Sequence, residues 1–520
     1  MTSFSVKYAM LVGAGAIGLA ASPAAAAECA DLAGMSLAHG EVTSATLVAA
    51  GEFEPPPSPF GPPPGVGGPS PYASMPAFCR VEVTLRPSGD SDIKSEVWLP
   101  AEDWNGKFVG IGNGIWAGQI SLSQMADPLK RGYAVASTDT GHVGTGLTAE
   151  FAIGHPEKLI DFGHRAVHET VLFAKQAIAS FYGNGPRISL WNSCSTGGRQ
   201  GMMSAYRYPE DFDAISAMAP ANPMTDLMTQ SMWAGWWPNR APGAKLGQAQ
   251  ITALHQTVVK KCDALDGLED GIIGRPNACN FDPAEIQCSG EAGDSCLTPP
   301  QVETMRAIYG GVTDGKGTKL LPGWPLGSEM QLGMLMSGPE PFPVANTYFT
   351  MLAYGDRPGW TFRDMDYASD VFVAREFGAD ILNAPADGLG PYFARGGKLL
   401  LSHGWNDGLI PAANALLFYQ QLYPTLTPAQ ANSQVRLYMV PGMDHCAGGE
   451  GASAYDTLAV IDEWAETGQA PYRITATRPT APPLNLPEIT RPLCPYPLYA
   501  RYDGEGDPAQ ASSFNCAAPT

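Results

Sequence analysis

The chain has 520 residues, of which 44% are hydrophobic and only 16% are charged. This composition supports a large globular core and excludes a mainly disordered or fibrous chain. The formal net charge is −20, and no run of Lys or Arg is long enough to form a basic patch. A nucleic-acid partner is therefore not expected, because neutralising phosphates requires clustered cations.

The first 27 residues predict a signal peptide. Lys7 supplies the positive start, Met10 to Ala21 forms a short apolar stretch, and Ala25 to Ala27 resembles a small-residue cleavage site. The apolar stretch is short for a membrane span, and no later stretch reaches about 18 apolar residues. We therefore expect a secreted or periplasmic protein without a membrane span once the signal is removed. An uncleaved N-terminal anchor is the alternative.

Ten cysteines follow the predicted cleavage point. An even number in an exported chain favours disulfides, and the paired C-x-x-C spacings typical of zinc sites are missing from the sequence. The count alone does not fix the pairing. Closure of short loops suggests three pairs, and two longer pairs then remain: Cys262–Cys279, Cys288–Cys296, Cys494–Cys516, Cys29–Cys79 and Cys194–Cys446.

The order of predicted strands and helices indicates an α/β fold with a doubly wound, mostly parallel sheet. From about Asn222 to Glu376 this rhythm breaks, so we assign residues 28–221 and 377–520 to one domain and residues 222–376 to a large insertion. The predicted strands are Cys79 to Leu85, Glu96 to Leu99, Lys107 to Ile111, Tyr133 to Ser137, Ile188 to Trp191, Lys398 to Ser402 and Gln434 to Val440, and the predicted helices are Arg165 to Tyr182 and Ala412 to Tyr423.

A candidate nucleophile, Ser195, directly follows the strand Ile188 to Trp191. A serine on a sharp strand-to-helix turn is exposed at the edge of the sheet, and the next backbone N–H, that of Thr196, points at a developing oxyanion. The usual pentad G-x-S-x-G is altered here, since Ser193 takes the first position. We expect a second oxyanion donor near Gly114, in a Gly-rich loop. The alternative is an ordinary Gly-rich turn with a solvated serine.

The insertion contains a string of carboxylates at short spacing, beginning after Cys262. Ca²⁺ takes six or more oxygen ligands on a tightly curled chain, which such a string can provide. The spacing is not that of an EF-hand, and a solvated acidic turn is the alternative. The predicted ligands are the side chains of Asp263, Asp266 and Asp270 and the carbonyls of Leu268 and Ile272.

Candidates for the acid and the base follow the last two predicted strands. Asp407 lies just after Lys398 to Ser402, and His445 follows the next strand, so the order Ser, Asp, His fits a catalytic triad. His403 precedes the acid, which favours a structural role in packing the loop. Asp444 is the alternative acid, but a residue adjacent to a histidine rarely turns back to its imidazole.

Cysteines flank both the candidate nucleophile and the candidate base. Cys194 precedes Ser195, and Cys446 follows His445. If the triad forms, these two cysteines lie near each other, and a disulfide between them fastens the two loops together. The alternative is that each cysteine pairs elsewhere.

Together these motifs resemble the tannase and feruloyl esterase family of α/β-hydrolases. The resemblance covers essentially the whole mature chain and includes the spacing of all ten cysteines and the acidic string. Departures are Ser193, where the family usually has Gly, and Asn113 and Ile115 within a usually purer glycine run. The matching pieces are Cys194-Ser195-Thr196-Gly197-Gly198, Ser137-Thr138-Asp139-Thr140-Gly141-His142, Gly396-Gly397-Lys398, His403-Gly404-x-x-Asp407 and Gly442-x-x-His445-Cys446.

The resemblance implies an α/β-hydrolase fold with Ser195, Asp407 and His445 as triad and Cys194–Cys446 as its disulfide. It also implies that the insertion is a lid holding one structural Ca²⁺. Family members split esters of aromatic acids, namely hydroxycinnamates on plant polysaccharide, galloyl esters, and hydroxyethyl terephthalate monoesters from polyester. We therefore expect a feruloyl esterase-like serine esterase acting on a small aromatic ester, with tannase or terephthalate monoester hydrolase activity as the alternative.

Two other classes of function remain open at this point, a serine peptidase and a calcium-stabilised binding protein without catalysis. Apolar lid residues are candidates to stack on an aromatic acyl group, although most are expected to form the lid core. A substrate carboxylate would favour a lid arginine, with Arg306, Arg357 and Arg363 as candidates. The apolar candidates are Trp233, Trp236, Trp237, Trp324, Phe342, Tyr348, Trp360, Met228, Met232, Met330, Met334 and Met336.

Overall fold

The computed structural model describes residues 29–56, 70–480 and 485–519, and the predicted signal peptide lies outside them. Its central feature is a nine-stranded sheet with the strand order β1-β2-β3-β5-β4-β6-β7-β8-β9. The strands are β1 (Gly40–Val48), β2 (Phe78–Leu85), β3 (Ile93–Pro100), β4 (Lys107–Gly110), β5 (Ala134–Thr138), β6 (Ile188–Cys194), β7 (Ala214–Met218), β8 (Lys398–Gly404) and β9 (Val435–Val440).

The prediction of a mostly parallel sheet is confirmed. Strands β5, β4, β6, β7, β8 and β9 pair in parallel, while β1, β2 and β3 form an antiparallel edge joined to β5. Strands β1 and β7 were not predicted from the sequence. The run Ala214–Met218 is short and built largely of small residues, yet it lies between the strand that leads to Ser195 and the strand that leads to Asp407.

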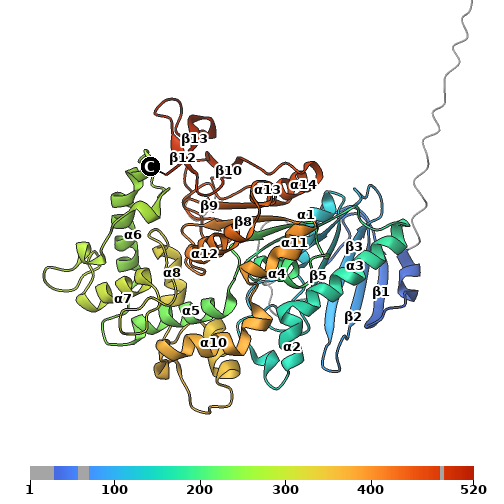
Figure 1. Cartoon of the computed structure of the whole chain (residues 1–520), viewed down its shortest axis with the longest axis horizontal. Helices are drawn as coiled ribbons and strands as arrows, with labels where there is room; N and C mark the ends of the chain where they lie inside the picture. Colours follow the sequence, from blue (N-terminus) through green and yellow to red (C-terminus); the bar gives the residue numbers. More distant parts are fainter. Residues whose placement is uncertain (1–28, 57–69, 481–484, 520) are drawn as a thin grey trace, which may run out of the picture.

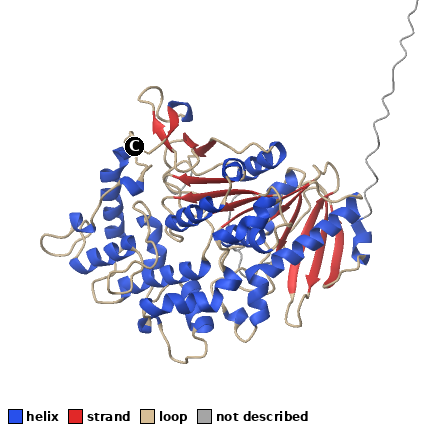
Figure 2. Cartoon of the chain, in the orientation of Figure 1, coloured by secondary structure: helices blue, strands red, loops and turns tan. Residues whose placement is uncertain are grey.

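Helices cover both faces of the sheet, as Figure 2 shows for the molecule as a whole. Neighbouring residues of a strand point to opposite faces, so Phe108 packs in the core layer under α3 and α4 whereas Val109 packs in the layer under α1 and α14. The covering helices are α1 (Leu122–Lys130), α3 (Ala166–Tyr182), α4 (Thr196–Arg207), α12 (Ala412–Leu422) and α14 (Thr457–Thr467).

The chain between β7 and β8 forms a helical insertion that lies beside the sheet (Figure 1). Its apolar core is rich in Trp, Tyr and Met and continues into the sheet domain, where Trp116 and Phe162 pack against it. The predicted boundary at residue 376 falls inside α10, which packs along α5. The helices are α5 (Met224–Asn239), α6 (Gln248–Cys262), α7 (Pro299–Gly310), α8 (Glu329–Met336), α9 (Pro343–Thr347), α10 (Tyr367–Leu382) and α11 (Gly390–Ala394).

The remaining elements complete the sheet domain. Two short helices, α2 (Pro156–Ile160) and α13 (Pro428–Ser433), lie in connections, and two hairpins follow α14. In the part of the chain that the structure describes, no helix is both long and apolar enough to cross a bilayer. The hairpins pair β10 (Ile474–Arg478) with β11 (Ile489–Leu493) and β12 (Tyr499–Tyr502) with β13 (Phe514–Ala517).

Five disulfides are present, with the pairings suggested by loop closure and by the resemblance. Four of them close loops of between 8 and 50 residues. The fifth, Cys194–Cys446, joins positions 252 residues apart and connects the end of β6 to the loop after β9. It therefore ties two strand ends at the same edge of the sheet.

Candidate active site

The predicted nucleophile turn is present where β6 ends and α4 begins. Ser195 is the residue between them, with φ 63° and ψ −126°. A non-glycine residue in this region is strained by roughly 1–3 kcal/mol and persists only where surrounding contacts enforce it. Here the Ser195 N–H donates to Met218 O on β7, and Cys194 is held by its disulfide. The strain lifts the hydroxyl of Ser195 off the sheet edge.

Ser193, which departs from the usual glycine, fits the turn because a glycine faces it. A side chain added at Gly197 would come within 2.1 Å of the Ser193 hydroxyl oxygen, so the space that Ser193 needs is left by Gly197. The Ser193 hydroxyl also accepts the N–H of Gly112 at 3.2 Å. The substitution therefore keeps the turn tight and adds a bond to the glycine-rich loop.

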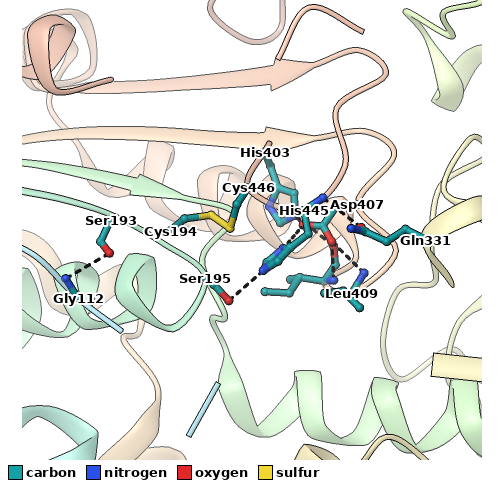
Figure 3. The surroundings of a disulfide bond; sticks show 11 residues. Gly112, Ser193, Cys194, Ser195, Gln331, His403, Asp407, Leu409, His445 and Cys446 are labelled. Carbon is teal, nitrogen blue, oxygen red and sulfur yellow. Dashed lines mark hydrogen bonds and ion pairs between the residues drawn. A yellow bond between two sulfur atoms is a disulfide. The ribbon is translucent and has the colours of Figure 1, made fainter. Parts of the chain in front are cut away.

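Figure 3 shows His445 between Ser195 and Asp407. The Nε2 atom of His445 lies 3.0 Å from the Ser195 Oγ atom, and its Nδ1 atom lies 2.8 Å from Asp407 Oδ2. The three residues come from loops after β6, β8 and β9, whose carboxyl ends meet at one edge because the strands are parallel. The structure therefore brings all three predicted triad residues together. The carboxylate that meets the imidazole is that of Asp407 rather than Asp444.

The environment keeps Asp407 ionised although it is fully buried. Its Oδ1 atom accepts the N–H groups of Leu409 and Ile410, at 2.9 and 2.8 Å. Burial opposes the charged form, but the imidazoles of His445 and His403 outweigh it and lower the pKa of Asp407 well below its usual range. Conversely, burial tends to lower the pKa of His445, and the Asp407 carboxylate raises it above the usual value.

His403 has a second contact that the sequence analysis did not assign. The prediction was a histidine that packs the loop, and its Nε2 atom does lie 3.1 Å from the carbonyl oxygen of Ile410. The same nitrogen also lies 3.1 Å from Asp407 Oδ2, so two imidazoles share this carboxylate. The only sequence feature that could have indicated this contact is the spacing of four residues between His403 and Asp407.

The glycine-rich loop after β4 lies against the nucleophile turn, as predicted for an oxyanion hole. Asn113 O accepts the N–H of Gly197 at 2.8 Å, and Ile115 O accepts the Thr196 hydroxyl at 2.7 Å. Among the described residues, the N–H groups of Gly114 and Thr196 have no protein acceptor. Both residues line the same cavity as Ser195.

A cavity of about 730 Å³ opens at Ser195 and His445, between the sheet domain and the insertion. Its walls are largely apolar, and no Asp, Glu, Lys or Arg of the described chain lines it. Isolated polar groups come from Asn113, Gln124 and Ser231. The apolar lining includes Ile115, Leu147, Met224, Leu227, Met228, Met334, Leu335, Phe342, Val344 and Leu409.

Three of the twelve predicted apolar lid candidates line this cavity, namely Met228, Met334 and Phe342. Most of the others belong to the lid core, where Trp324 and Tyr348 for example are almost completely buried. Leu227 and Val344 also line the cavity and were not predicted, because periodicity alone does not distinguish a core-facing from a cavity-facing apolar residue. The three arginine candidates lie elsewhere: Arg306 pairs with Asp282, and Arg357 and Arg363 lie over the rings of Tyr354 and Phe362.

The acidic string forms a curled loop after α6, closed by Cys262–Cys279. Asp263 accepts the N–H groups of Asp270 and Gly271, while Asp270 also pairs with Arg491 at 2.5 Å. No cluster of three or more Asp, Glu, His or Cys side chains within the described ranges is arranged to hold a metal ion. A small cavity of about 30 Å³ is nevertheless lined by four of the five predicted ligands, Asp266, Leu268, Asp270 and Ile272.

The chemistry of Asp266 fits a nearby cation. Burial, together with the charges of Asp270 and Asp263, raises the pKa of Asp266 to about 7. Gly274 makes room for its carboxylate, because a side chain there would come within 2.1 Å of an Asp266 oxygen. A partly buried carboxylate beside two others is stabilised by a bound cation, so the residues of this loop are compatible with Ca²⁺.

The mostly parallel sheet and the strained serine turn after β6 define an α/β-hydrolase, with the histidine supplied after β9. Comparison with known proteins agrees. The family model for "Tannase and feruloyl esterase" matches residues 79–352 and 360–517. The probable feruloyl esterase B-2 of Aspergillus terreus is 31% identical, over 84% of this chain and 86% of that protein.

The mono(2-hydroxyethyl) terephthalate hydrolase of Piscinibacter sakaiensis is 30% identical, with 86% of each chain covered. The crystal structure of feruloyl esterase B from Aspergillus oryzae superposes with a TM-score of 0.85 at 27% identity, covering 94% of this chain and 99% of that one. The chain therefore belongs to the tannase and feruloyl esterase family, and it is a carboxylic ester hydrolase.

Proposed function

We propose that this enzyme hydrolyses esters of uncharged aromatic acids through an acyl-enzyme intermediate on Ser195, as a feruloyl esterase-like activity. The observation that carries the proposal is the hydrogen-bonded line from Asp407 through His445 to Ser195, ending at the wall of an apolar cavity. Such a line activates a serine for acyl transfer, and the cavity is concave and large enough for a small aromatic ester.

In the acylation step, His445 Nε2 takes the hydroxyl proton while Ser195 Oγ bonds to the ester carbonyl carbon. The carbonyl oxygen becomes an oxyanion, and the N–H groups of Gly114 and Thr196 stabilise it. Asp407 holds the imidazole in the tautomer that presents Nε2 to the serine and stabilises its charged form. His445 then gives the proton to the leaving alcohol, and the ester bond breaks.

Deacylation repeats these roles with water as the nucleophile. His445 takes a proton from the water, the hydroxide oxygen bonds to the acyl carbon, and the bond to Ser195 Oγ breaks as the serine regains the proton. The free aromatic acid leaves. His403 contributes by fixing the Asp407 carboxylate, which it contacts at 3.1 Å.

The lining of the cavity supports an uncharged acyl group. A substrate carboxylate buried there would have no cationic partner on the wall, and an unpaired buried charge is strongly unfavourable. This disfavours the terephthalate monoester alternative, although a relative is named for that activity. Apolar groups such as Met228 and Phe342 favour an aromatic ring, as in the hydroxycinnamate esters of plant polysaccharide.

The direct test is turnover of methyl ferulate, methyl gallate and mono(2-hydroxyethyl) terephthalate by the mature enzyme and by Ser195→Ala. We expect methyl ferulate to be turned over with the highest kcat/KM, and Ser195→Ala to lose roughly 10⁴–10⁶-fold in kcat. A preference for the terephthalate monoester would contradict the charge argument. Failure of the enzyme to react with a fluorophosphonate, or cleavage of peptides in place of esters, would contradict the esterase proposal itself.

We also propose that the insertion, residues 222–376, acts as a lid with one structural Ca²⁺. The side chains of Asp263, Asp266 and Asp270 and the carbonyls of Leu268 and Ile272 would hold the ion. The raised pKa of Asp266 and the shared small cavity support this role. The ion would stabilise the loop between α6 and the sheet domain rather than take part in the reaction.

We also propose that the protein is exported from the cytoplasm. Five disulfides are typical of proteins that fold in an oxidising compartment, and they agree with a signal peptide at residues 1–27. Mass spectrometry of the exported protein tests this directly. An N-terminus near Glu28 is expected, and a protein retaining residues 1–27 would contradict it.

A further inference from the structure

One lid side chain contacts the loops of both the acid and the base. The Oε1 atom of Gln331, on α8, accepts the backbone N–H of Gly408 at 2.9 Å and that of His445 at 3.0 Å. Figure 3 shows Gln331 reaching these loops from the side opposite Ser195. A single amide oxygen therefore joins the loop after β8 to the loop after β9.

The backbone of α8 packs directly on the acid loop. A side chain at Gly408 would come within 2.4 Å of Leu332 N and 2.8 Å of Gln331 Cβ, so a glycine is needed at that position. Gly408 follows Asp407 immediately. The helix and the acid loop are thus in backbone contact, and a displacement of α8 would displace Asp407.

A buried ionic network holds α8 in place. Glu329, at its first position, accepts the Tyr309 hydroxyl at 2.8 Å and pairs with His255 Nδ1 at 2.7 Å. His255 Nε2 then pairs with Glu450, 3.1 Å away in the segment that follows His445 and Cys446. The helix is consequently fastened to the base loop at a second point.

We propose that Gln331 is a positioning residue, through which the lid holds His445 and Asp407 in register for catalysis. This inference rests on the proposed function of that triad. His445 is held on one side by Cys446, whose disulfide partner Cys194 precedes the nucleophile. On the other side it is held by Gln331, which also fixes the loop of the acid.

Helix α8 also forms part of the cavity wall. Met334 and Leu335 of α8 line the cavity beside Ser195, so a ligand in the cavity contacts the helix that holds the triad loops. Substrate packing on α8 thus acts on the same element that sets the distances between His445 and its partners. Small misplacements of reacting groups reduce rates by up to about a hundredfold.

The test compares Gln331→Leu, which removes the acceptor, with Gln331→Glu, which keeps it. Gln250→Leu is the matched control, because Gln250 also accepts a backbone N–H in the lid, that of Gly247, and neither residue lines the cavity. The first readout is the rate at which a fluorophosphonate labels Ser195, measured against pH. The second is the steady-state kinetics with methyl ferulate, which give KM and, per labelled site, kcat. Labelling reports the nucleophile without depending on the identity of the ester.

We expect Gln331→Leu to reduce the labelling rate and kcat about 10–100-fold with little change in KM. The acid limb of its pH profile, the range in which the rate falls because His445 becomes charged, should move to lower pH, because His445 loses alignment with Asp407. At pH values above the acid limb, the labelling rate and kcat of Gln331→Glu should stay within several-fold of those of the parent enzyme. Its limb should move to higher pH, because a further negative charge joins Asp407 and Asp444 around His445. Gln250→Leu should change neither the rates nor the limb.

If Gln331 had only a structural role, Gln331→Leu would have fewer labelled sites but the same labelling rate per site and the same acid limb. That result would overturn the inference. If Gln331→Leu does not fold, Gln331→Glu decides, since an unshifted limb with parental rates would equally overturn it. A parent enzyme that labels but hydrolyses no ester would contradict the proposed substrate, while the labelling rates would still test Gln331.

Discussion

The sheet domain and the lid contribute to the active site in different ways. The sheet carries the proposed reacting groups, because Ser195, Asp407 and His445 follow three parallel strands whose ends meet at one edge. The lid supplies cavity wall and support, through apolar side chains and through Gln331. Backbone geometry fixes the first set, whereas side-chain packing fixes the second. Substitutions of the triad residues and of Gln331 should therefore lower kcat, whereas substitutions of the apolar cavity wall should raise KM.

After Ser195→Ala, the largest effect is expected in the sheet domain, from Asp407→Asn. The amide preserves the shape but favours the wrong imidazole tautomer, so kcat should fall roughly 10⁴-fold. Asp444→Asn, next to His445 along the chain, should change kcat by less than about tenfold. Steady-state kinetics on methyl ferulate measures both. Equal losses in the two variants would mean that Asp407 is not the acid.

Removal of the disulfide beside the triad should cost more stability than removal of one in the lid. Cys194–Cys446 closes a far longer loop than Cys288–Cys296, with sequence separations of 252 and 8. In the chain-entropy model the paired alanine variants lose about 5.5 and about 2.5 kcal/mol of unfolding free energy, respectively. Chemical denaturation tests the order. Only the variant without Cys194–Cys446 should also have a lower kcat. A lower kcat found only in the variant without Cys288–Cys296 would contradict the assignment of the triad to the sheet domain.

A lid change at the cavity should affect KM before kcat. Phe342→Ala removes apolar wall that an aromatic substrate contacts, and such contacts are worth about 1–3 kcal/mol, so KM for methyl ferulate should rise about 10–100-fold. Trp360→Ala is the matched control, because Trp360 packs on Phe349 and Tyr354 within the lid. A similar KM for the two variants would place the acyl group elsewhere.

The pH dependence should report the base of the sheet domain. Since the Asp407 carboxylate raises the pKa of His445, the imidazole remains charged to a higher pH than an ordinary histidine. A charged imidazole does not accept the Ser195 proton, so kcat/KM should fall about tenfold per pH unit below a midpoint above 6.5. The profile of kcat/KM against pH measures this midpoint. A midpoint well below 6.5 would contradict the pairing with Asp407.

The smallest effect is expected from the proposed Ca²⁺, which would act on the loop between α6 and the sheet domain and not on the triad. Burial raises the pKa of Asp266 to about 7, so the apo lid should lose stability as pH rises through 7, and Ca²⁺ should restore it. Chelation should lower Tm by several degrees at pH 8 and by less at pH 6, with kcat at low temperature nearly unchanged. In Asp266→Asn the Tm should not depend on Ca²⁺. Thermal unfolding at both pH values is the measurement.

The sequence was sufficient for features that depend on local order along the chain. Ser195 follows an apolar strand, and Asp407 and His445 follow the next two strands that it identified, so the topology of a parallel sheet was enough to expect them at one edge. Short loop spacing likewise suggested Cys262–Cys279, Cys288–Cys296 and Cys494–Cys516. The strand β7 was missed because its small residues give little periodic signal.

Only the tertiary structure decided the contacts between segments far apart in sequence. Nothing local to Gln331 distinguishes it from other lid glutamines, and its role arises because α8 packs on Gly408. The cavity wall has the same origin, since Met228 and Met232 lie on one helix yet one faces the cavity and the other the core. The physical reason is that strand order fixes where a loop ends, whereas packing between the lid and the sheet depends on the shapes of both surfaces together.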